Sequence, residues 1–430
     1  MSKIQVQTSL LRDNIVVSGE TFTNYLLIKA IPADVSVQAM PLNVSLVLDV
    51  SGSMYNEKRL EYVKRAAEHV VDMMGQADIV SVVAFADRSK AVSEAKTADG
   101  KDAIKQAIRN IEHADVGSGT SMYLGMENGV AEVLKNLSEG RSNRVIVLTD
   151  GQTRGEEKCE QIAEKEAPRG VGFSAIGVGS DWNDVLLEKI AQIGHGKWHY
   201  VDTPEKAQQI FQEEFGQLIA TAFSNVILKL HLMKDILVKR ARQVEPDYQE
   251  FTIDTGAERF AVVPLGSMQK DTPKWIVADI GLPKRTLGRY LILRVELIYD
   301  IPTSNIFGES TDLIPVYVVY TDDRSQSYVN GEVARSIDQI QIEDLTSKAT
   351  GFLNQGDKAR ATMLLQNAQN IANRTGDARK TQALNQTLGE LSQSGQVSRK
   401  TMLHLKDQAR RTGLLSPEET EELLKKASET

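Results

Sequence analysis

One strand that ends in a polar turn constrains the fold of this 430-residue chain more than any other feature. The run Val44–Leu48 is short, apolar and rich in valine and leucine, which is typical of a central strand. The turn Asp49–Ser53 follows immediately and places a carboxylate and two hydroxyls at alternate positions around a glycine. A helical pattern begins near Leu60. The segment therefore predicts a buried strand, a loop that presents oxygen atoms, and a helix.

Two further segments place polar side chains at comparable positions. Val145–Gly151 is a second apolar strand, and it ends in Asp150 and a turn glycine. The loop Gly117–Ser121 is small and flexible, and it presents Thr120 just before another helical segment. In a doubly wound sheet, ligands collect beyond the carboxyl ends of the parallel strands. We therefore expect the three loops to converge.

A hard divalent cation prefers oxygen ligands of this kind. Together the three loops resemble the metal-ion-dependent adhesion site (MIDAS) of the von Willebrand factor type A (VWA) family. The D-x-S-x-S element, the separate threonine and the L-T-D-G aspartate occur in the family's order and approximate spacing, with no position replaced. The resemblance implies that Asp49, Ser51, Ser53, Thr120 and Asp150 hold Mg²⁺, with Mn²⁺ and Ca²⁺ as the other candidate ions.

Residues 42–223 alternate between apolar strands and amphipathic helices. This alternation predicts an α/β fold with a doubly wound, mostly parallel six-stranded sheet covered on both faces, and the VWA resemblance implies the same Rossmann-like fold. The last helix of this domain is expected over Glu205–Phe223. Strands are expected at Val44–Leu48, Asp78–Phe85, Ala91–Val92, Val145–Thr149, Val171–Val178 and Trp198–Val201.

The segments before and after this domain carry period-two apolar runs separated by turn residues, which predicts antiparallel strands. Residues 1–41 are too few to bury a core alone, so we expect them to pair with residues 224–330 in one β-sandwich. The VWA domain would then be an insertion, as in bacterial intracellular multidomain proteins of the family. The expected strands include Ile4–Gln7, Tyr25–Lys29, Val226–Leu232, Phe260–Val263, Tyr290–Val295 and Pro315–Tyr320.

Residues 331–430 are rich in alanine, glutamine and leucine, and they predict a C-terminal α-helical region. Glycine-containing turns separate the helical segments and indicate a small array of helical hairpins. The predicted helices are Gln339–Asn354, Asp357–Thr375, Ala378–Gln393, Arg399–Arg411 and Pro417–Ala427.

Composition narrows the classes of partner and compartment. The net charge of −8 and the pI near 5.5 argue against nucleic-acid binding, which needs a basic surface. Cys159 is the only cysteine, so no disulfide can form within the chain. Residues 1–10 lack an apolar signal region, and no apolar stretch approaches the roughly 20 residues of a membrane span. We therefore expect a cytoplasmic location and no membrane span.

The resemblance implies a metal-dependent protein–protein interaction module. An Asp or Glu of a partner protein would complete the coordination of the ion. In related domains the last helix moves when the metal gains an acidic ligand. We therefore hypothesise that occupancy of the metal is coupled to the orientation of the sandwich and the helical region.

Other functions remain open. The chain could be an accessory subunit of an AAA+ ATPase (chelatase or MoxR-like) system, or a structural protein that self-associates through the metal.

Asp49 and Asp150 could act as a general acid–base pair, but no histidine or lysine base lies on the neighbouring loops, so we expect no enzyme. His195 and His199 have a zinc-like spacing. Glycines flank the first and the second lies in a predicted strand, so no zinc site is expected.

Overall fold

The computed structural model describes residues 3–17, 21–33, 38–112, 116–150, 152–179, 183–201, 207–255 and 259–412. The chain divides into two compact units. The central unit consists of Val37–Ala222 and Ile301–Asn305. The flanking unit consists of Met1–Ser36, Phe223–Asp300 and Ile306–Thr430.

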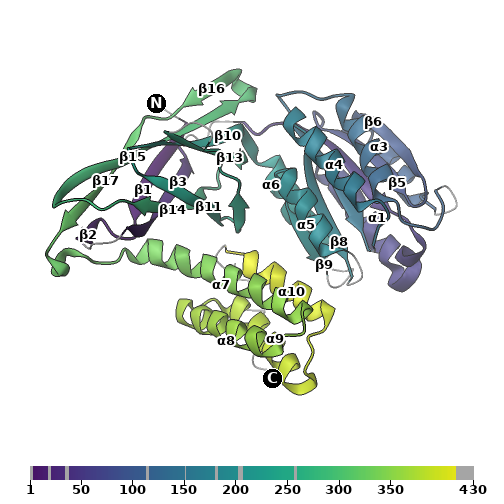
Figure 1. Ribbon diagram of the computed structural model, residues 1–430. Helices are drawn as coiled ribbons and strands as arrows, with labels where there is room; N and C mark the ends of the chain where they lie inside the picture. The colour runs from purple at the N-terminus through teal and green to yellow at the C-terminus, as the bar shows by residue number, and fades with distance from the viewer. Residues whose placement is uncertain are drawn as a thin grey trace. The chain divides into compact units, whose positions relative to one another are not determined.

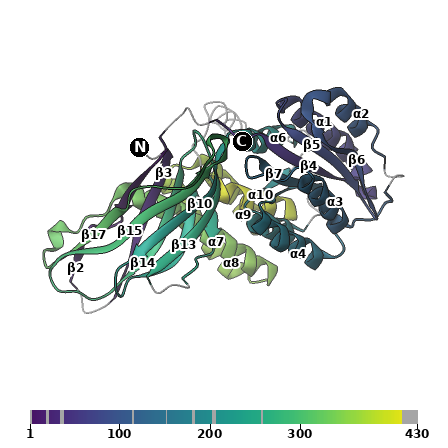
Figure 2. The ribbon, with the colours of Figure 1, turned by 90° about the horizontal axis from the view of Figure 1, so that it is seen from above.

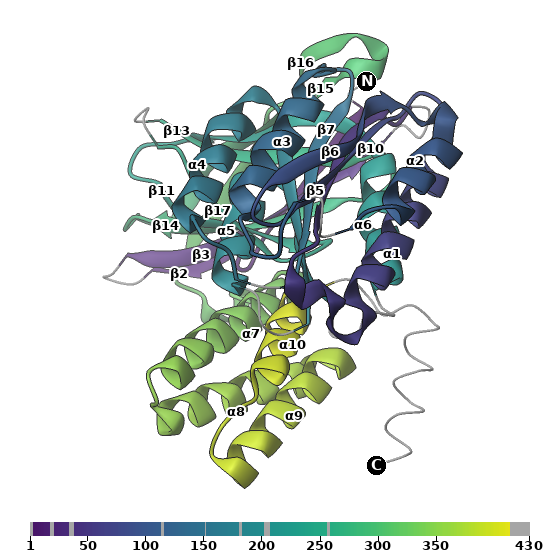
Figure 3. The ribbon, with the colours of Figure 1, turned by 90° about the vertical axis from the view of Figure 1, so that its right-hand side faces the viewer.

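The central unit contains one six-stranded sheet (Figures 1 and 3). In spatial order its strands are β6 (Ser89–Thr97), β5 (Ile79–Phe85), β4 (Leu42–Asp49), β7 (Ser142–Thr149), β8 (Gly172–Val178) and β9 (Trp198–Val201). Only β6 is antiparallel to its neighbour among these strands. Every residue of β4, β5 and β7 is buried, as expected for strands covered on both faces. The predicted mostly parallel α/β sheet is confirmed.

Helices cover both faces of this sheet (Figure 3). One face carries α1 (Arg59–Met73), α2 (Lys101–Arg109) and α6 (Ala207–Ile219), and α1 packs against both of the others. The opposite face carries α3 (Met122–Leu134), α4 (Glu156–Glu166) and α5 (Asp184–Ile193). Short 3-10 segments, Gly52–Lys58 (η1), Ala98–Gly100 and Ala167–Arg169, precede or follow these helices.

The strand order positions the predicted site. The chain runs from β4 outward to β5 and β6 and then returns to β7 on the other side of β4. The carboxyl ends of β4 and β7 therefore flank the point at which the strand order reverses, where open α/β sheets bind their ligands. Asp49 is the last residue of β4, and Asp150 follows β7 directly.

The flanking unit contains two sheets (Figures 1 and 2). The first has the order β1 (Ile4–Leu10), β3 (Phe22–Pro32), β14 (Lys274–Leu282), β11 (Leu237–Glu245), β12 (Gln249–Phe251). The second has the order β13 (Phe260–Gln269), β10 (Thr221–Leu232), β15 (Gly288–Ile301), β17 (Ile314–Thr321), β2 (Asn14–Val16), and β16 (Ile306–Ser310) also pairs with β15. β3 pairs antiparallel with β14, so strands from before and after the VWA-like segment share one sheet.

Among the described residues after β17, the long helices are α7 (Gly331–Asn354), α8 (Lys358–Thr375), α9 (Ala378–Ser394) and α10 (Arg399–Arg410). Each is preceded by an N-cap residue whose side chain accepts a hydrogen bond from a backbone N–H group of the first turn: Asn330, Asp357, Asp377 and Ser398. Apolar side chains of α7, including Val333 and Ile340, pack on Leu27 and Val277 of the first sheet. The predicted C-terminal helical region is confirmed.

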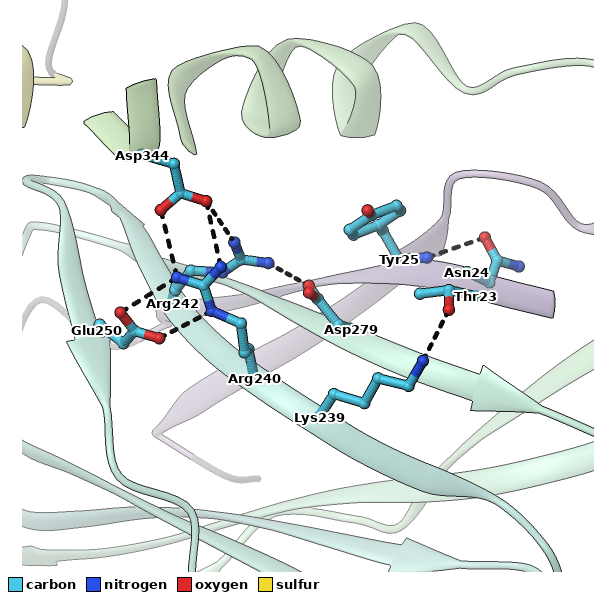
Figure 4. Close-up of polar contacts among 9 residues, drawn as sticks. All are labelled: Thr23, Asn24, Tyr25, Lys239, Arg240, Arg242, Glu250, Asp279 and Asp344. Atoms are coloured by element: carbon cyan, nitrogen blue, oxygen red, sulfur yellow. Dashed lines mark hydrogen bonds and ion pairs between the residues drawn. The ribbon is translucent and has the colours of Figure 1, made fainter. Parts of the chain in front are cut away.

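Ion pairs hold α7 on that sheet as well (Figure 4). The Arg240 guanidinium donates to Glu250 on β12 and to Asp344 on α7, at 2.8–3.2 Å. Arg242 pairs with Asp279 on β14 and lies 3.7 Å from Asp344. The helical region and the first sheet are therefore joined by both apolar packing and charge.

Several predicted boundaries were wrong. The last helix of the central unit ends at Ile219 rather than Phe223, because Thr221 begins strand β10. Strands β11 and β14 were not predicted at all, and α7 begins at Gly331 rather than Gln339. The predicted helix 417–427 lies outside the described residues. None of the helices in the described ranges is long and apolar enough to cross a membrane.

Candidate metal centre

Two buried carboxylates lie at the carboxyl edge of the central sheet. Asp49 and Asp150 have no solvent-exposed area. Asp49 accepts hydrogen bonds from the Ser51 backbone N–H to Oδ1 at 2.9 Å and from the Thr149 hydroxyl to Oδ2 at 2.6 Å. These contacts orient the carboxylate, because each oxygen is held by a different donor.

The two serine hydroxyls link the strand ends. Ser51 Oγ lies 3.1 Å from Ser53 Oγ, and Ser53 Oγ donates to Asp150 Oδ1 at 2.7 Å. An octahedral magnesium shell with bonds of about 2.0–2.1 Å has adjacent oxygens about 2.9 Å apart. The spacing of these oxygens matches neighbouring corners of such a shell. The donor set therefore fits a small, hard divalent cation.

The threonine loop lies next to this turn. The Gly52 N–H donates to the Ser118 carbonyl at 2.9 Å, which brings the loop that carries Thr120 against the D-x-S-x-S turn. Thr120 is half-buried, and its carbonyl accepts from the Arg154 N–H at 3.0 Å. The structure thus joins Ser51, Ser53 and Asp150 by side-chain contacts, whereas the Thr120 loop is joined through its backbone.

Burial makes the centre unfavourable for an isolated negative charge. Removal from water, with a smaller contribution from the charge of Asp150, raises the pKa of Asp49 to about 6, although the hydrogen bonds from Thr149 and Ser51 lower it. A divalent cation would offset the repulsion between the two carboxylates. Asp49, Ser51, Ser53, Thr120 and Asp150 are the residues that would hold it.

Two residues at this edge were missed from the sequence. Asp87 follows β5 and accepts the Ser118 and Gly119 N–H groups at 3.0 and 2.9 Å, so it fixes the loop before Thr120. These hydrogen bonds lower the pKa of Asp87. The position of Asp87 just after a strand was a usable signal, because Asp49 and Asp150 also lie at strand ends.

Arg59 is the second missed residue. It begins α1, and its guanidinium donates to Asp150 Oδ2 at 3.0 Å. The sequence held no signal for this contact, because an arginine at a helix start is usually a solvated surface residue.

The remaining titratable candidates pack elsewhere in the central unit. His199 Nε2 lies 3.0 Å from Glu214 Oε2 on α6, and Ser174 donates to Glu214 Oε1 at 2.5 Å. His195 lies in a turn with a positive φ of 49°. Cys159 is buried, and burial raises its pKa to about 12, so the thiol is neutral near pH 7. Within the described ranges, no three His, Cys, Asp or Glu side chains form a metal cluster.

Two family models match parts of this chain. Residues 43–213 match the family of von Willebrand factor type A domains. This part of the chain is therefore a VWA domain, with the α/β fold described above. Residues 331–415 match the Sll0103-like, C-terminal alpha-helical domain family.

Individual relatives match different shares of the chain. The uncharacterized protein sll0103 of Synechocystis sp. is 28% identical over 348 residues, which cover 80% of this chain and 81% of that protein. The uncharacterized protein YfbK of Escherichia coli is 27% identical over 43% of this chain and 32% of its own length. The solved von Willebrand factor type A structure from Catenulispora acidiphila has 17% identity and a TM-score of 0.81, covering 96% of this chain and 98% of that chain. That structural likeness shows the fold.

Proposed function

We propose that this protein is a metal-dependent protein-recognition module, whose centre binds an Asp or Glu side chain of a partner protein. The observation that supports it is the chain of oxygen contacts from Ser51 to Ser53 to Asp150, with spacings of 3.1 and 2.7 Å at the strand-order reversal. When bound, Mg²⁺, or Mn²⁺ or Ca²⁺ in its place, supplies an electrophilic position that accepts a carboxylate oxygen.

The carboxylates and the hydroxyls of the candidate centre have different roles in this proposal. Asp49 and Asp150 supply the negative charge that retains the cation, and both are buried, so water competes weakly for them. The serine and threonine hydroxyls add ligands without adding charge, which leaves the loaded centre attractive to an anion. A desolvated, charge-assisted contact is worth several kcal/mol, whereas an exposed ion pair is worth about 1 kcal/mol or less. One partner carboxylate can therefore decide binding.

The proposal places the chain among binding proteins rather than enzymes. A hydrolase that used Asp49 and Asp150 would need a general base within reach of a bound water. The described side chains that contact the two carboxylates are hydroxyls and one arginine. Turnover of any substrate that disappears in Asp49→Ala would contradict this part of the proposal.

The proposal extends to the architecture. We propose that the two sheets of the flanking unit form one sandwich into which the VWA domain is inserted. The pairing of β3 with β14 supports it, because these strands lie on either side of the domain in sequence.

An affinity capture experiment tests the function. The intact chain and the Ser51→Ala/Ser53→Ala variant serve as baits in Mg²⁺ and again in EDTA, with the exposed Arg65→Gln as a matched control on the neighbouring helix. We expect partners that bind the intact chain and Arg65→Gln in Mg²⁺ only. A partner set that is identical for all baits in both buffers would refute the proposal.

Light scattering of the same samples separates binding of another protein from self-association. Self-association through the metal would lower the measured mass when EDTA is added. A mass that does not change on chelation, together with metal-dependent capture, supports a distinct partner.

A further inference from the structure

Arg59 places a positive charge inside the candidate centre. It is the first residue of α1, and its NH1 group lies 3.0 Å from Asp150 Oδ2. The arginine side chain is 12% exposed and the aspartate side chain is fully buried. Because the pair is shielded from solvent, the charge of the guanidinium acts on the centre with little screening.

The fold holds this guanidinium in place. It lies against Gly179, at the end of β8, where a Cβ atom would come within 3.3 Å of Cζ and 3.4 Å of NH1 and NH2. Gly179 also has a φ of 79°, which favours glycine. The Arg59 side chain therefore lies between the ends of β7 and β8. A residue larger than glycine at position 179 would narrow the space that its guanidinium occupies.

The charges around the centre can be added up. The two carboxylates contribute −2 and Arg59 contributes +1, so a bound divalent cation leaves a net charge of +1. Without the arginine the loaded centre would be neutral. Asp87, behind the threonine loop, is itself flanked by the exposed Arg88 and Arg154.

We propose that Arg59 is the specificity-determining residue of the centre. Its charge weakens retention of the cation and strengthens attraction of a carboxylate, so the loaded centre selects an anionic ligand over a neutral one. The inference rests on the proposed function for its ligand, but its effect on the cation can be measured alone.

The first measurement is titration of the full chain with MgCl₂ and with MnCl₂ by calorimetry. Arg59→Gln removes the charge and keeps a hydrogen-bond donor, Arg59→Lys keeps the charge, and the exposed Arg65→Gln removes the same charge elsewhere on α1. We expect Arg59→Gln to bind the cations about tenfold more tightly. Arg59→Lys and Arg65→Gln are expected to stay within about twofold of the unmodified chain.

The second measurement uses acetate as the ligand probe. With Mn²⁺ bound, coordination of acetate speeds the relaxation of its methyl protons, and acetamide is the neutral control. We expect acetate to bind Arg59→Gln about tenfold more weakly than the unmodified chain, while Arg65→Gln is unchanged.

The outcomes separate the two claims. Unchanged or weaker cation binding by Arg59→Gln would overturn the inference, since the arginine would then only anchor Asp150. Unchanged acetate affinity in Arg59→Gln would overturn its role in selectivity. Failure of the unmodified, Mn²⁺-loaded chain to bind acetate in preference to acetamide would instead contradict the proposed function, and the cation titration would still decide whether Arg59 sets the charge.

Discussion

At the scale of single residues, the buried charge of Asp49 lowers the stability of the fold and at the same time provides a ligand for a cation. Asp49 is wholly buried beside a second carboxylate, and its raised pKa reports the cost of its charge. A bound cation offsets that cost. Metal binding and folding stability are therefore linked at this residue.

Asp49→Asn tests this link. In EDTA at pH 7 we expect the variant to be more stable than the unmodified chain by about 1–2 kcal/mol, because the buried charge is gone although one acceptor is lost. In excess Mg²⁺ the unmodified chain should gain stability and the variant should gain none. Thermal unfolding in both buffers measures the two effects. A variant less stable than the unmodified chain in EDTA would contradict the argument.

Asp87 acts on the centre through the loop before Thr120. Asp87→Ala removes the acceptor of the Ser118 and Gly119 N–H groups, so the loop should hold its hydroxyl less firmly. We expect magnesium affinity to fall about three- to tenfold. Calorimetry measures it, with the fully exposed Asp102→Ala as control. Equal affinities for the unmodified chain and Asp87→Ala would show that the loop needs no such support.

At the scale of elements, α6 is fastened to the sheet by a buried polar group. Glu214 on α6 contacts His199 on β9 and Ser174 on β8. Desolvation opposes its charge, but the hydrogen bond and charge of His199 and the charge of Arg144 lower its pKa to about 2. Because this pKa lies below the unfolded value of about 4.5, the charge stabilises the fold above that pH.

Glu214→Gln should therefore be less stable than the unmodified chain by about 3 kcal/mol at pH 7. The difference should shrink as the pH falls from about 4.5 toward 2, where the unmodified chain loses the same contribution. Urea unfolding across this pH range measures it, with the exposed Glu157→Gln as control. A difference that is constant with pH would assign the effect to packing alone.

The elements that the sequence predicted correctly, such as β4 and β7, are those whose residue pattern can be recognised within the segment itself. The buried β4 and β7 are continuous apolar runs followed by turn residues, so their pattern needs no partner to be recognised. β11 was missed because Arg240 and Arg242 interrupt its pattern, and the acids that pair with them lie on β12, β14 and α7. The end of α6 was misplaced because Ala222 and Phe223 continue its apolar stripe, whereas pairing of β10 with β15 extends that segment as a strand.

The same distinction applies to the candidate centre. Asp49, Ser51 and Ser53 are close in sequence, and the strand-end rule connects them to Asp150. Arg59 joins the centre only through a contact across the fold, which no spacing encodes. Whether Asp49, Ser51, Ser53, Thr120 and Asp150 all bind one ion stays a prediction.

At the scale of the whole molecule, one of the chain segments that link the two units follows the end of α6. A single residue, Ala220, separates α6 from β10, the strand that continues into the flanking unit. The flanking unit is itself tied together, since α7 packs on the first sheet and Arg240 bridges Glu250 and Asp344 (Figure 4). We therefore expect a displacement of α6 to be passed to β10, and through β10 to the flanking unit.

Coupling through this junction needs two states that differ in affinity for the metal and its ligand. With Cys159 replaced by serine, spin labels at the exposed Val185 on α5 and Met363 on α8 report the distance between the units. We expect the distance distribution to change when Mg²⁺ and acetate are added to the otherwise unmodified chain, and to stay fixed in Asp49→Ala. Identical distributions in both proteins would mean that α6 and Ala220 link the units in sequence only, because a ligand that binds two states equally cannot shift them.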